Sequence, residues 1–229
     1  MNFEDKLKQR YSGEGGKAYH DTKRSVPDSA YSWIAKLRAE KIEPQINPGD
    51  TVLEYGVGTG WNLAQIKCKR RLGFDLSEHL EPLLQNHGME FVKNIGEVAD
   101  ESIDVVICHH VLEHTGSPSE ILKQIKRILR PDGKLLLFVP FEKERRYRRY
   151  NPEEANHHLY SWNVQTLGNL VSDMGFNIIR GRIQEFGYDR FASVWSARLG
   201  WGQGGFRLIR KAIHLIKPAS EVYIIAKKQ

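Results

Sequence analysis

Five residues with chemically versatile side chains lie within the segment ICHHVLEHT, residues 107–115. They are Cys108, His109, His110, Glu113 and His114. Imidazole nitrogens and carboxylate oxygens can bind a metal ion, and histidine can also accept a proton near neutral pH. The subset His110, Glu113 and His114 has the HxxEH spelling of one class of zinc protease, in which the motif lies inside a helix. The secondary structure of this segment therefore decides which chemistry is open to it.

Two more histidines, His157 and His158, stand in the later segment NHHLYSW. Histidine suits the role of a general base because its ordinary pKa lies near neutrality. A structural role, in which the ring braces a loop or faces solvent, stays open beside the catalytic one for each of these histidines.

An alternation of short apolar runs with helically spaced segments begins at residue 51. This alternation predicts a parallel sheet with crossover helices. The expected strands are residues 51–56, 70–76, 89–94, 102–109 and 133–140, followed by 176–186 and 221–228. The segment ICHHVLEHT thus comes at the end of a strand, which argues against the zinc-protease interpretation.

Cap residues and apolar spacing predict the helices that lie between these strands. Ser117 and Glu120 have the spacing of a capping box, and Pro118 suits the first helical position. A later helix is expected at about residues 163–174. These features are explained by folding alone, so we assign them no catalytic role.

Length and composition favour a single domain. The chain has 229 residues, 40% of them hydrophobic, with a formal net charge of +6 and two cysteines. We expect a cytoplasmic protein, because the sequence shows no membrane-spanning run, no secretory signal and no disulfide framework. The expected parts are an N-terminal lid and helix (1–48), a cofactor-binding core (49–140), and substrate-side segments with the last two strands (141–229).

The segment EYGVGTG, residues 54–60, is expected between a strand and a helix. Its glycines would let the backbone approach a flat or anionic ligand. The spacing GxGxG differs from the GxGxxG of dinucleotide-binding proteins, and no Walker lysine follows Gly60. Asp75, nineteen positions after Gly56, stands where a carboxylate can accept hydrogen bonds from both hydroxyls of a ribose. The alternative is that these residues serve only as turn glycines and a helix cap.

Four segments, in this order and spacing, resemble the class I S-adenosylmethionine-dependent methyltransferases. They are VLEYGVGTG, GFDLS, IDVVICHHVLEH and LKQIKRILRPDGKLLLFVP, and the resemblance is close over roughly residues 45–140. It implies an α/β fold with a Rossmann-like seven-stranded sheet, the last strand antiparallel, helices on both faces, and S-adenosyl-L-methionine as the cofactor.

The resemblance also implies which residues hold the cofactor. Glu54 and the glycines of the loop would contact the methionine portion of the cofactor. Asp75, after the second strand, would bind the ribose, and the two residues after the third strand would flank the adenine. The expected cofactor-binding residues are Glu54, Gly56, Gly58, Gly60, Asp75, Leu76, Asn94, Ile95 and His109.

Methyl transfer to a hydroxyl requires alignment of the oxygen and removal of its proton. We therefore expect O-methylation of a small or lipid- or glycan-linked acceptor, with His110 and His158 as the general bases. A non-catalytic binding protein that keeps the cofactor fold is an alternative.

A second resemblance, to small-RNA 2′-O-methyltransferases, implies a metal site. Its ligands would be His110, Glu113, His114 and His158, although His110 stands where that family has glutamate. A divalent metal is the less favoured interpretation, since Glu-His after this strand also occurs in members of the wider family that use no metal. RNA is accordingly an alternative partner.

Two further segments could select the acceptor. The run EKERRYRRY, residues 142–150, could bind a phosphate, a nucleic-acid backbone or an anionic lipid surface, or could be a solvated loop. Residues 190–218 mix aromatic and basic side chains, as in an interfacial helix pair, a substrate cover or a dimer contact. Within them, the portion LIRKAIHLI is expected to pack its apolar face against the core.

Overall fold

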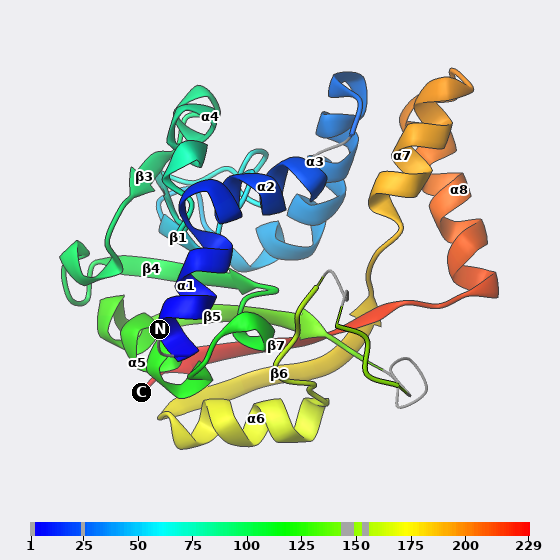
Figure 1. The fold of residues 1–229 in the computed structure, drawn as a ribbon. Coiled ribbons are helices and arrows are strands. Elements are labelled where there is room, and N and C mark those ends of the chain that lie inside the picture. The colour runs from blue at the N-terminus through cyan, green and yellow to red at the C-terminus, as the bar shows by residue number, and fades with distance from the viewer. Residues whose placement is uncertain (1–2, 24–25, 143–148, 153–155) are drawn as a thin grey trace.

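A seven-stranded sheet forms the centre of the protein in a computed structural model that describes residues 3–23, 26–142, 149–152 and 156–229 (Figure 1). The strand order is β3-β2-β1-β4-β5-β7-β6. β1 to β5 are parallel, whereas β7 runs antiparallel to both β5 and β6. This confirms the expected Rossmann-like sheet with its last strand antiparallel. The strands are β1 Thr51–Tyr55, β2 Arg70–Phe74, β3 Glu90–Val92, β4 Ile103–His109, β5 Leu129–Pro140, β6 Phe176–Glu185 and β7 Ser220–Lys228.

Helices cover both faces of the sheet because successive strand residues point to opposite sides. Leu53 of β1 belongs to one buried cluster together with side chains of α5 and α6. Its neighbour Val52 belongs to the opposite cluster, which includes side chains of α3 and α4. These helices are α3 Asp28–Ile42, α4 Glu81–Asn86, α5 Pro118–Ile128 and α6 Val164–Asp173, and the short 3-10 helices are η1 Glu43–Gln45, η2 Glu78–Leu80, η3 Ile95–Glu97 and η4 Leu112–His114.

Two local expectations are wrong. Residues 56–69, all of them described, form turns and contain no helix. Trp61, Asn62 and Leu63 are all buried in succession, whereas a helix lying on a sheet buries a single stripe. The capping box at α5 does not form either, because the Ser117 hydroxyl pairs with Ser119 and the Glu120 carboxylate accepts from Lys123.

The N-terminal helices lie over the carboxyl ends of the central strands (Figure 1). These are α1 Phe3–Tyr11 and α2 Gly13–Lys23. The Ser77 hydroxyl, just after β2, donates a hydrogen bond to the Tyr11 carbonyl at 2.7 Å. The expected lid segment is therefore in contact with the rim of the sheet.

A helical hairpin, α7 Asp189–Arg198 and α8 Gly202–Ile216, stands to one side of the sheet and packs on α3 (Figure 1). A small core of Ile34, Trp61, Ala192 and Phe206 joins the hairpin to the body. Within the described residues, no helix is long and apolar enough to cross a membrane.

The expectation that LIRKAIHLI packs its apolar face inward holds in part, since Ile209 packs against the small core that contains Phe206. Leu208, Leu215 and Ile216 are exposed, whereas Arg210 and His214 of the same helix are buried. The inward face of α8 also makes polar contacts, because the Arg210 guanidinium donates to Asp189 Oδ1 at 3.0 Å.

Candidate active site

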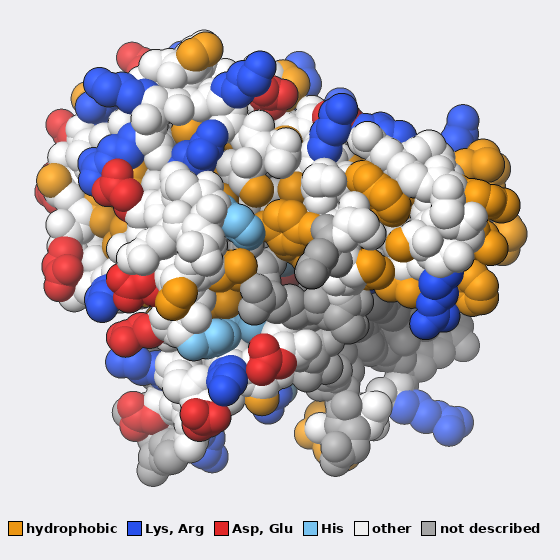
Figure 2. Space-filling view, turned by 90° about the horizontal axis from the view of Figure 1, so that it is seen from above, with side chains coloured by type: hydrophobic (Ala, Val, Ile, Leu, Met, Phe, Trp, Pro, Cys, Tyr) orange, Lys and Arg blue, Asp and Glu red, His pale blue; other side chains and the backbone are white. Residues whose placement is uncertain are grey.

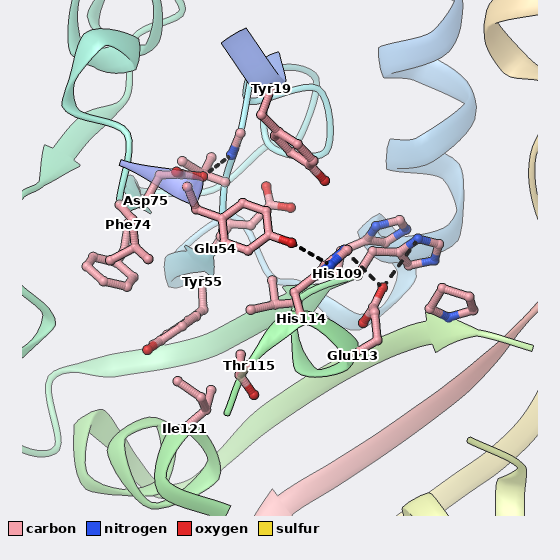
Figure 3. Close-up of a pocket in the computed structure, with 18 of the residues that line it drawn as sticks. Tyr19, Glu54, Tyr55, Phe74, Asp75, His109, Glu113, His114, Thr115 and Ile121 are labelled. Carbon is pink, nitrogen blue, oxygen red and sulfur yellow. Dashed lines mark hydrogen bonds and ion pairs between the residues drawn. The ribbon is translucent and has the colours of Figure 1, made fainter. Parts of the chain in front are cut away.

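A cavity of about 950 Å³ opens at the carboxyl ends of β1, β2 and β4. Its wall is formed by the glycine loop after β1, the end of β2, the turn after β4, and side chains of α1 and α2. In an open parallel sheet, ligands bind in the crevice outside these strand ends. Figure 3 shows Asp75 and Phe74 toward one end of the cavity and His109 toward the other, with Glu54 between them.

The glycine loop follows β1 in a backbone conformation that favours glycine. Gly56 has φ of +74° and Gly58 has φ of +53°. A Cβ atom at Gly56 would collide with the Val111 side chain, whereas at Gly58 it would meet nothing closer than His20 at 3.7 Å. Gly56 is thus required by close packing, while Gly58 leaves its backbone open to a ligand.

Glu54 is a fully buried acid at the inner wall of the cavity. Burial raises the pKa of Glu54 to about 8. One carboxyl oxygen accepts a hydrogen bond from the Asn62 side chain, and the other, Oε2, has no hydrogen-bond partner among the described residues. A buried polar atom left in this way costs free energy, so the site fits a ligand that brings a donor or a cation. The ammonium group of the cofactor's methionine portion would supply both.

Asp75 is fixed at the end of β2 by backbone donors. Its Oδ2 accepts from the Gly58 amide at 2.9 Å and its Oδ1 from the Ser77 amide at 3.0 Å. His20 Nε2 lies 3.8 Å from Oδ1. Each carboxylate oxygen can accept more than one hydrogen bond, so the geometry leaves capacity for the two ribose hydroxyls.

The other expected cofactor residues divide into two groups. Leu76 and His109 line the cavity. Gly60, Asn94 and Ile95 are not part of its wall. Gly60 packs against Leu84 and Met89, the Asn94 side chain caps η3 by accepting from the Gly96 amide, and Ile95 is buried in the core. The expected adenine contact therefore stays a prediction that this geometry does not support.

The end of β4 is bent at His110, whose φ is +57°. Its amide donates to the Phe138 carbonyl of β5 at 2.9 Å, and η4 begins two residues later. A left-handed backbone at a residue other than glycine is uncommon and is found where surrounding contacts hold it, often at functional sites. The HxxEH motif thus follows the end of a strand, as the sequence predicts, and continues into a 3-10 turn.

Glu221, at the start of β7, ties the first histidine pair together. Its Oε2 lies 3.1 Å from His110 Nε2 and 3.5 Å from His109 Nε2, and its Oε1 accepts from Lys41 and Gln184. Burial would raise the pKa of Glu221, but hydrogen bonds from both histidines and the Lys41 charge hold it well below its usual range. Burial lowers the pKa of His110 to about 3, so this ring is neutral near pH 7. Glu221 is therefore ionised and accepts the proton of His110 Nε2, which leaves Nδ1 with a lone pair.

A second cluster contains Glu113, His114 and His158. One ligand atom from each lies within 4.8 Å of the others. His158 Nδ1 lies 2.8 Å from Glu142 Oε1, and the Tyr11 hydroxyl lies 3.1 Å from His114 Nδ1. With Nδ1 donating to Glu142, the Nε2 atom of His158 can accept a proton or bind a metal ion.

The four expected metal ligands are brought close together but do not form one group. His110 belongs to the cluster with His109 and Glu221, and its Nδ1 lies 4.0 Å from Glu113 Oε1. The remaining three ligands are the second cluster described above. His157, the neighbouring histidine, does not line the cavity.

The basic run at residues 142–150 falls largely outside the described residues. Glu142 at its start is described, and it contacts His158, while residues 143–148 are not described. The expected role of the arginines in binding an anion stays a prediction.

The sequence did not point to Glu221, to Glu142, or to Tyr11 and Tyr19 of the N-terminal helices as residues of the site. Glu221 could have been found from the antiparallel last strand, because such a strand begins at the rim where the parallel strands end. Its register partner is Pro140, the last residue of β5. Glu142 begins a run dominated by arginines, so nothing in the sequence singled out its carboxylate. Tyr11 and Tyr19 reach the cavity only because α1 and α2 pack over the rim of the sheet.

Comparison with known proteins agrees with this site. A family model described as a methyltransferase domain matches residues 26–180, about two thirds of the chain. The chain belongs to this family, the class I S-adenosylmethionine-dependent methyltransferases, and is an enzyme of that class.

Individual relatives are distant. A Methanocaldococcus jannaschii protein described as uncharacterized is 23% identical over 76% of this chain and 86% of its own length. The thiol S-methyltransferase TMT1B of Rattus norvegicus is 31% identical over 38% of this chain, and a ubiquinone biosynthesis O-methyltransferase of Coxiella burnetii is 30% identical over 44%. The matches span 41% and 49% of these two proteins, less than half of each.

Solved structures share the fold at low identity. Phosphoethanolamine N-methyltransferase 2 of Haemonchus contortus, in complex with S-adenosyl-L-methionine, has a TM-score of 0.63 and 17% identity over 100% of this chain and 60% of that one. The [4+2]-cyclase SpnF has a TM-score of 0.60 and 17% identity over 86% and 80%. These likenesses show the fold alone.

Proposed function

We propose that the protein methylates a hydroxyl oxygen of a small or lipid- or glycan-linked acceptor. The observation that carries the proposal is one cavity whose wall includes both Asp75 with the glycine loop and the histidines after β4. The cofactor end and the proton-accepting end of the reaction thus share a single space. Its volume of about 950 Å³ is at the upper end for ligand sites, which leaves room for an acceptor beside a cofactor.

The cofactor end would hold S-adenosyl-L-methionine through three groups of this chain. Glu54 would pair with the ammonium group, Asp75 would accept the ribose hydroxyls, and the open backbone at Gly58 would approach the ligand. When bound, the cofactor supplies the electrophilic methyl group. The protein contributes alignment, since an in-line displacement depends on the direction from which the oxygen approaches.

His158 is the better placed of the two expected bases. The Glu142 carboxylate accepts from its Nδ1, which leaves the lone pair of its Nε2 to accept a proton. His110, with its pKa lowered to about 3 by burial, is a weak proton acceptor. We assign His158 the proton of the acceptor hydroxyl, and assign His110, held by Glu221, the role of orienting that hydroxyl through Nδ1.

The nature of the acceptor atom is open to direct measurement. The relatives named above act on sulfur, oxygen and nitrogen by their printed descriptions, so similarity alone does not choose. The test is transfer of labelled methyl from the cofactor to small-molecule, lipid and glycan fractions, followed by alkaline treatment and mass spectrometry. Label in an alkali-stable methyl ether is expected. Label found only on nitrogen or sulfur would overturn the proposal.

The proton role has its own test in kcat. Glu142→Gln removes the carboxylate that accepts from His158 Nδ1, so the ring is no longer fixed with Nε2 toward the acceptor, and kcat should fall at least about tenfold while cofactor affinity is retained. Glu97→Gln, an exposed acid outside the cavity, serves as the matched control and should leave kcat unchanged. An unchanged kcat in Glu142→Gln would count against His158 as the base.

Metal-assisted transfer, including transfer to an RNA 2′ hydroxyl, is the second candidate. It is favoured by the ligand atoms of Glu113, His114 and His158 within 4.8 Å of one another and by the carboxylate behind His158. A bound divalent ion would lower the pKa of the attacking hydroxyl. Metal analysis of protein purified without a histidine tag and activity after chelation decide between the candidates. Stoichiometric metal and chelator-sensitive activity, both lost in His114→Gln, would favour this second candidate.

A further inference from the structure

The α7–α8 hairpin exposes an unusual amount of apolar surface. The exposed large side chains on it are Phe191, Trp195, Leu199, Trp201, Leu208, Leu215 and Ile216. Figure 2 shows hydrophobic side chains gathered at the side of the molecule that the hairpin forms. Single exposed apolar residues are ordinary, but a contiguous group of large ones marks a surface that binds another protein or a membrane.

The arrangement of α8 excludes simple incomplete burial as the reason. Its buried face contains Arg210, which is 8% exposed, whereas Leu215 and Ile216 are 79% and 87% exposed. The helix therefore buries a paired cation beside Phe206 and leaves Leu215 and Ile216 outside. Turning α8 to bury the aliphatic side chains would break the ion pair of Arg210 with Asp189. The outward position of the apolar side chains is thus fixed by the fold.

Cations dominate the surface of the hairpin. Its acid, Asp189, is buried in the ion pair with Arg210. Residues 190–220 contain no aspartate or glutamate, and they include six cations, of which Arg207 pairs with Glu40 of α3: Arg190, Arg198, Arg207, Arg210, Lys211 and Lys217. Arg207 and Lys211 are exposed on α8 beside the apolar stripe, and the Arg198 guanidinium lies 6.0 Å from the Trp195 ring centre. An apolar face flanked by cations and tryptophans is the pattern of helices that lie in a membrane interface.

We propose that the α7–α8 hairpin docks the protein on the surface of an anionic lipid bilayer. Its aromatic and aliphatic side chains would enter the boundary of headgroups and acyl chains, while the cations meet lipid phosphates. Self-association through the same face is disfavoured, because a two-fold interface would set the cations of two hairpins against each other without any acid of residues 190–220 to pair with them.

The cavity lies next to this surface. Phe186 and Arg190, at the base of the hairpin, are part of the cavity wall, and the exposed Phe191 follows directly. Docking would therefore hold the cavity near the membrane surface, where a lipid-linked acceptor is found. Membrane docking itself does not depend on the proposed methyl transfer, and either could fail alone.

Flotation with lipid vesicles tests the inference without cofactor or acceptor. The wild-type chain should float with vesicles of phosphatidylcholine and phosphatidylglycerol, bind pure phosphatidylcholine vesicles more weakly, and lose binding as salt concentration rises. The double variant Leu215→Gln and Ile216→Gln should lower the partition coefficient more than about tenfold, because both side chains lose their apolar insertion. Ile179→Gln, an exposed apolar residue on β6, is the matched control and should bind as the wild type does.

A second pair of variants changes only exposed cations, so that a loss of vesicle binding does not come from a folding defect. Lys211→Gln with Lys217→Gln removes two exposed cations and should weaken binding to anionic vesicles severalfold, whereas Lys67→Gln with Lys69→Gln should not. Absence of wild-type flotation would overturn the proposal, as would equal binding by the hairpin variants. A wild-type dimer that Leu215→Gln and Ile216→Gln dissociate, without any vesicle binding, would assign the surface to a second copy of the chain.

Discussion

Ionisation of Glu54 should make cofactor binding depend on pH. Burial raises the pKa of this carboxyl group to about 8, so roughly ten molecules are protonated for each ionised one at pH 7. Its proposed partner, the α-ammonium group of the ligand, stands beside its own carboxylate and is charged at pH 7. A carboxylate–ammonium pair holds one proton, whereas the separated groups together hold nearly two at pH 7. Binding should therefore release about 0.9 proton at pH 7.

The sign of the effect follows from the raised pKa. Below pH 8 the carboxyl group must lose its proton before it can pair, so affinity falls as the pH falls. The ionised fraction of Glu54 is roughly 50-fold larger at pH 8 than at pH 6, which corresponds to about 2 kcal/mol of binding free energy.

Calorimetry with S-adenosylhomocysteine measures both quantities, because this product keeps the amino group and cannot react. Titrations at one pH in two buffers of different ionisation enthalpy give the number of protons released. Glu54→Gln keeps the volume of the side chain and removes its ionisation, so its affinity should be lower and nearly constant between pH 6 and pH 7. Equal wild-type affinity at pH 6 and pH 8, or unchanged proton release in Glu54→Gln, would refute the reasoning.

Three other results are expected. Asp75→Ala should abolish cofactor binding in calorimetry, since the ribose hydroxyls lose their acceptor; wild-type affinity in this variant would contradict the ribose assignment. Asp189→Ala should lower the free energy of unfolding by about 3 kcal/mol in urea titrations, because the buried Arg210 loses its closer carboxylate and keeps only the exposed Glu185 at 3.5 Å; Glu90→Gln, in an exposed pair, should cost less than about 1 kcal/mol, and similar losses in both would count against the argument. Glu221→Gln should lower kcat at least about tenfold with cofactor affinity retained, since His110 loses its fixed orientation; an unchanged kcat would remove His110 from the proposed machinery.

The sheet was predictable because its strands are short apolar runs that sit between polar helices and turns. Burial of both faces in a parallel sheet leaves this pattern regardless of distant contacts. The segment after the glycine loop was not predictable in the same way. Trp61, Asn62 and Leu63 are buried against different neighbours, and that environment exists only after the loop, α4 and the hairpin have docked.

The proposed cofactor end of the site was also largely accessible from the sequence, because Glu54, Gly58 and Asp75 lie at or just after the carboxyl ends of strands in a parallel sheet. The acceptor end was not, since its pairs join residues far apart in the chain. His110 meets Glu221 across 111 positions, and Tyr11 meets His114 across 103. Local spacing carries no information about such contacts, and only the antiparallel entry of β7 would have placed Glu221 on the same rim.

Glu54 and Glu221, two of the buried glutamates at the site, favour opposite protonation states for a physical reason. Glu54 has the neutral Asn62 as its hydrogen-bond donor, so burial dominates and favours the protonated form. Glu221 accepts from Lys41 and from two histidines, so its neighbours outweigh burial and favour the ionised form. The charge of Glu221 is already compensated, whereas Glu54 gains its charge together with a cationic ligand. The Glu54 end of the cavity therefore suits a cationic ligand, and the histidine end suits the neutral hydroxyl of the proposed acceptor.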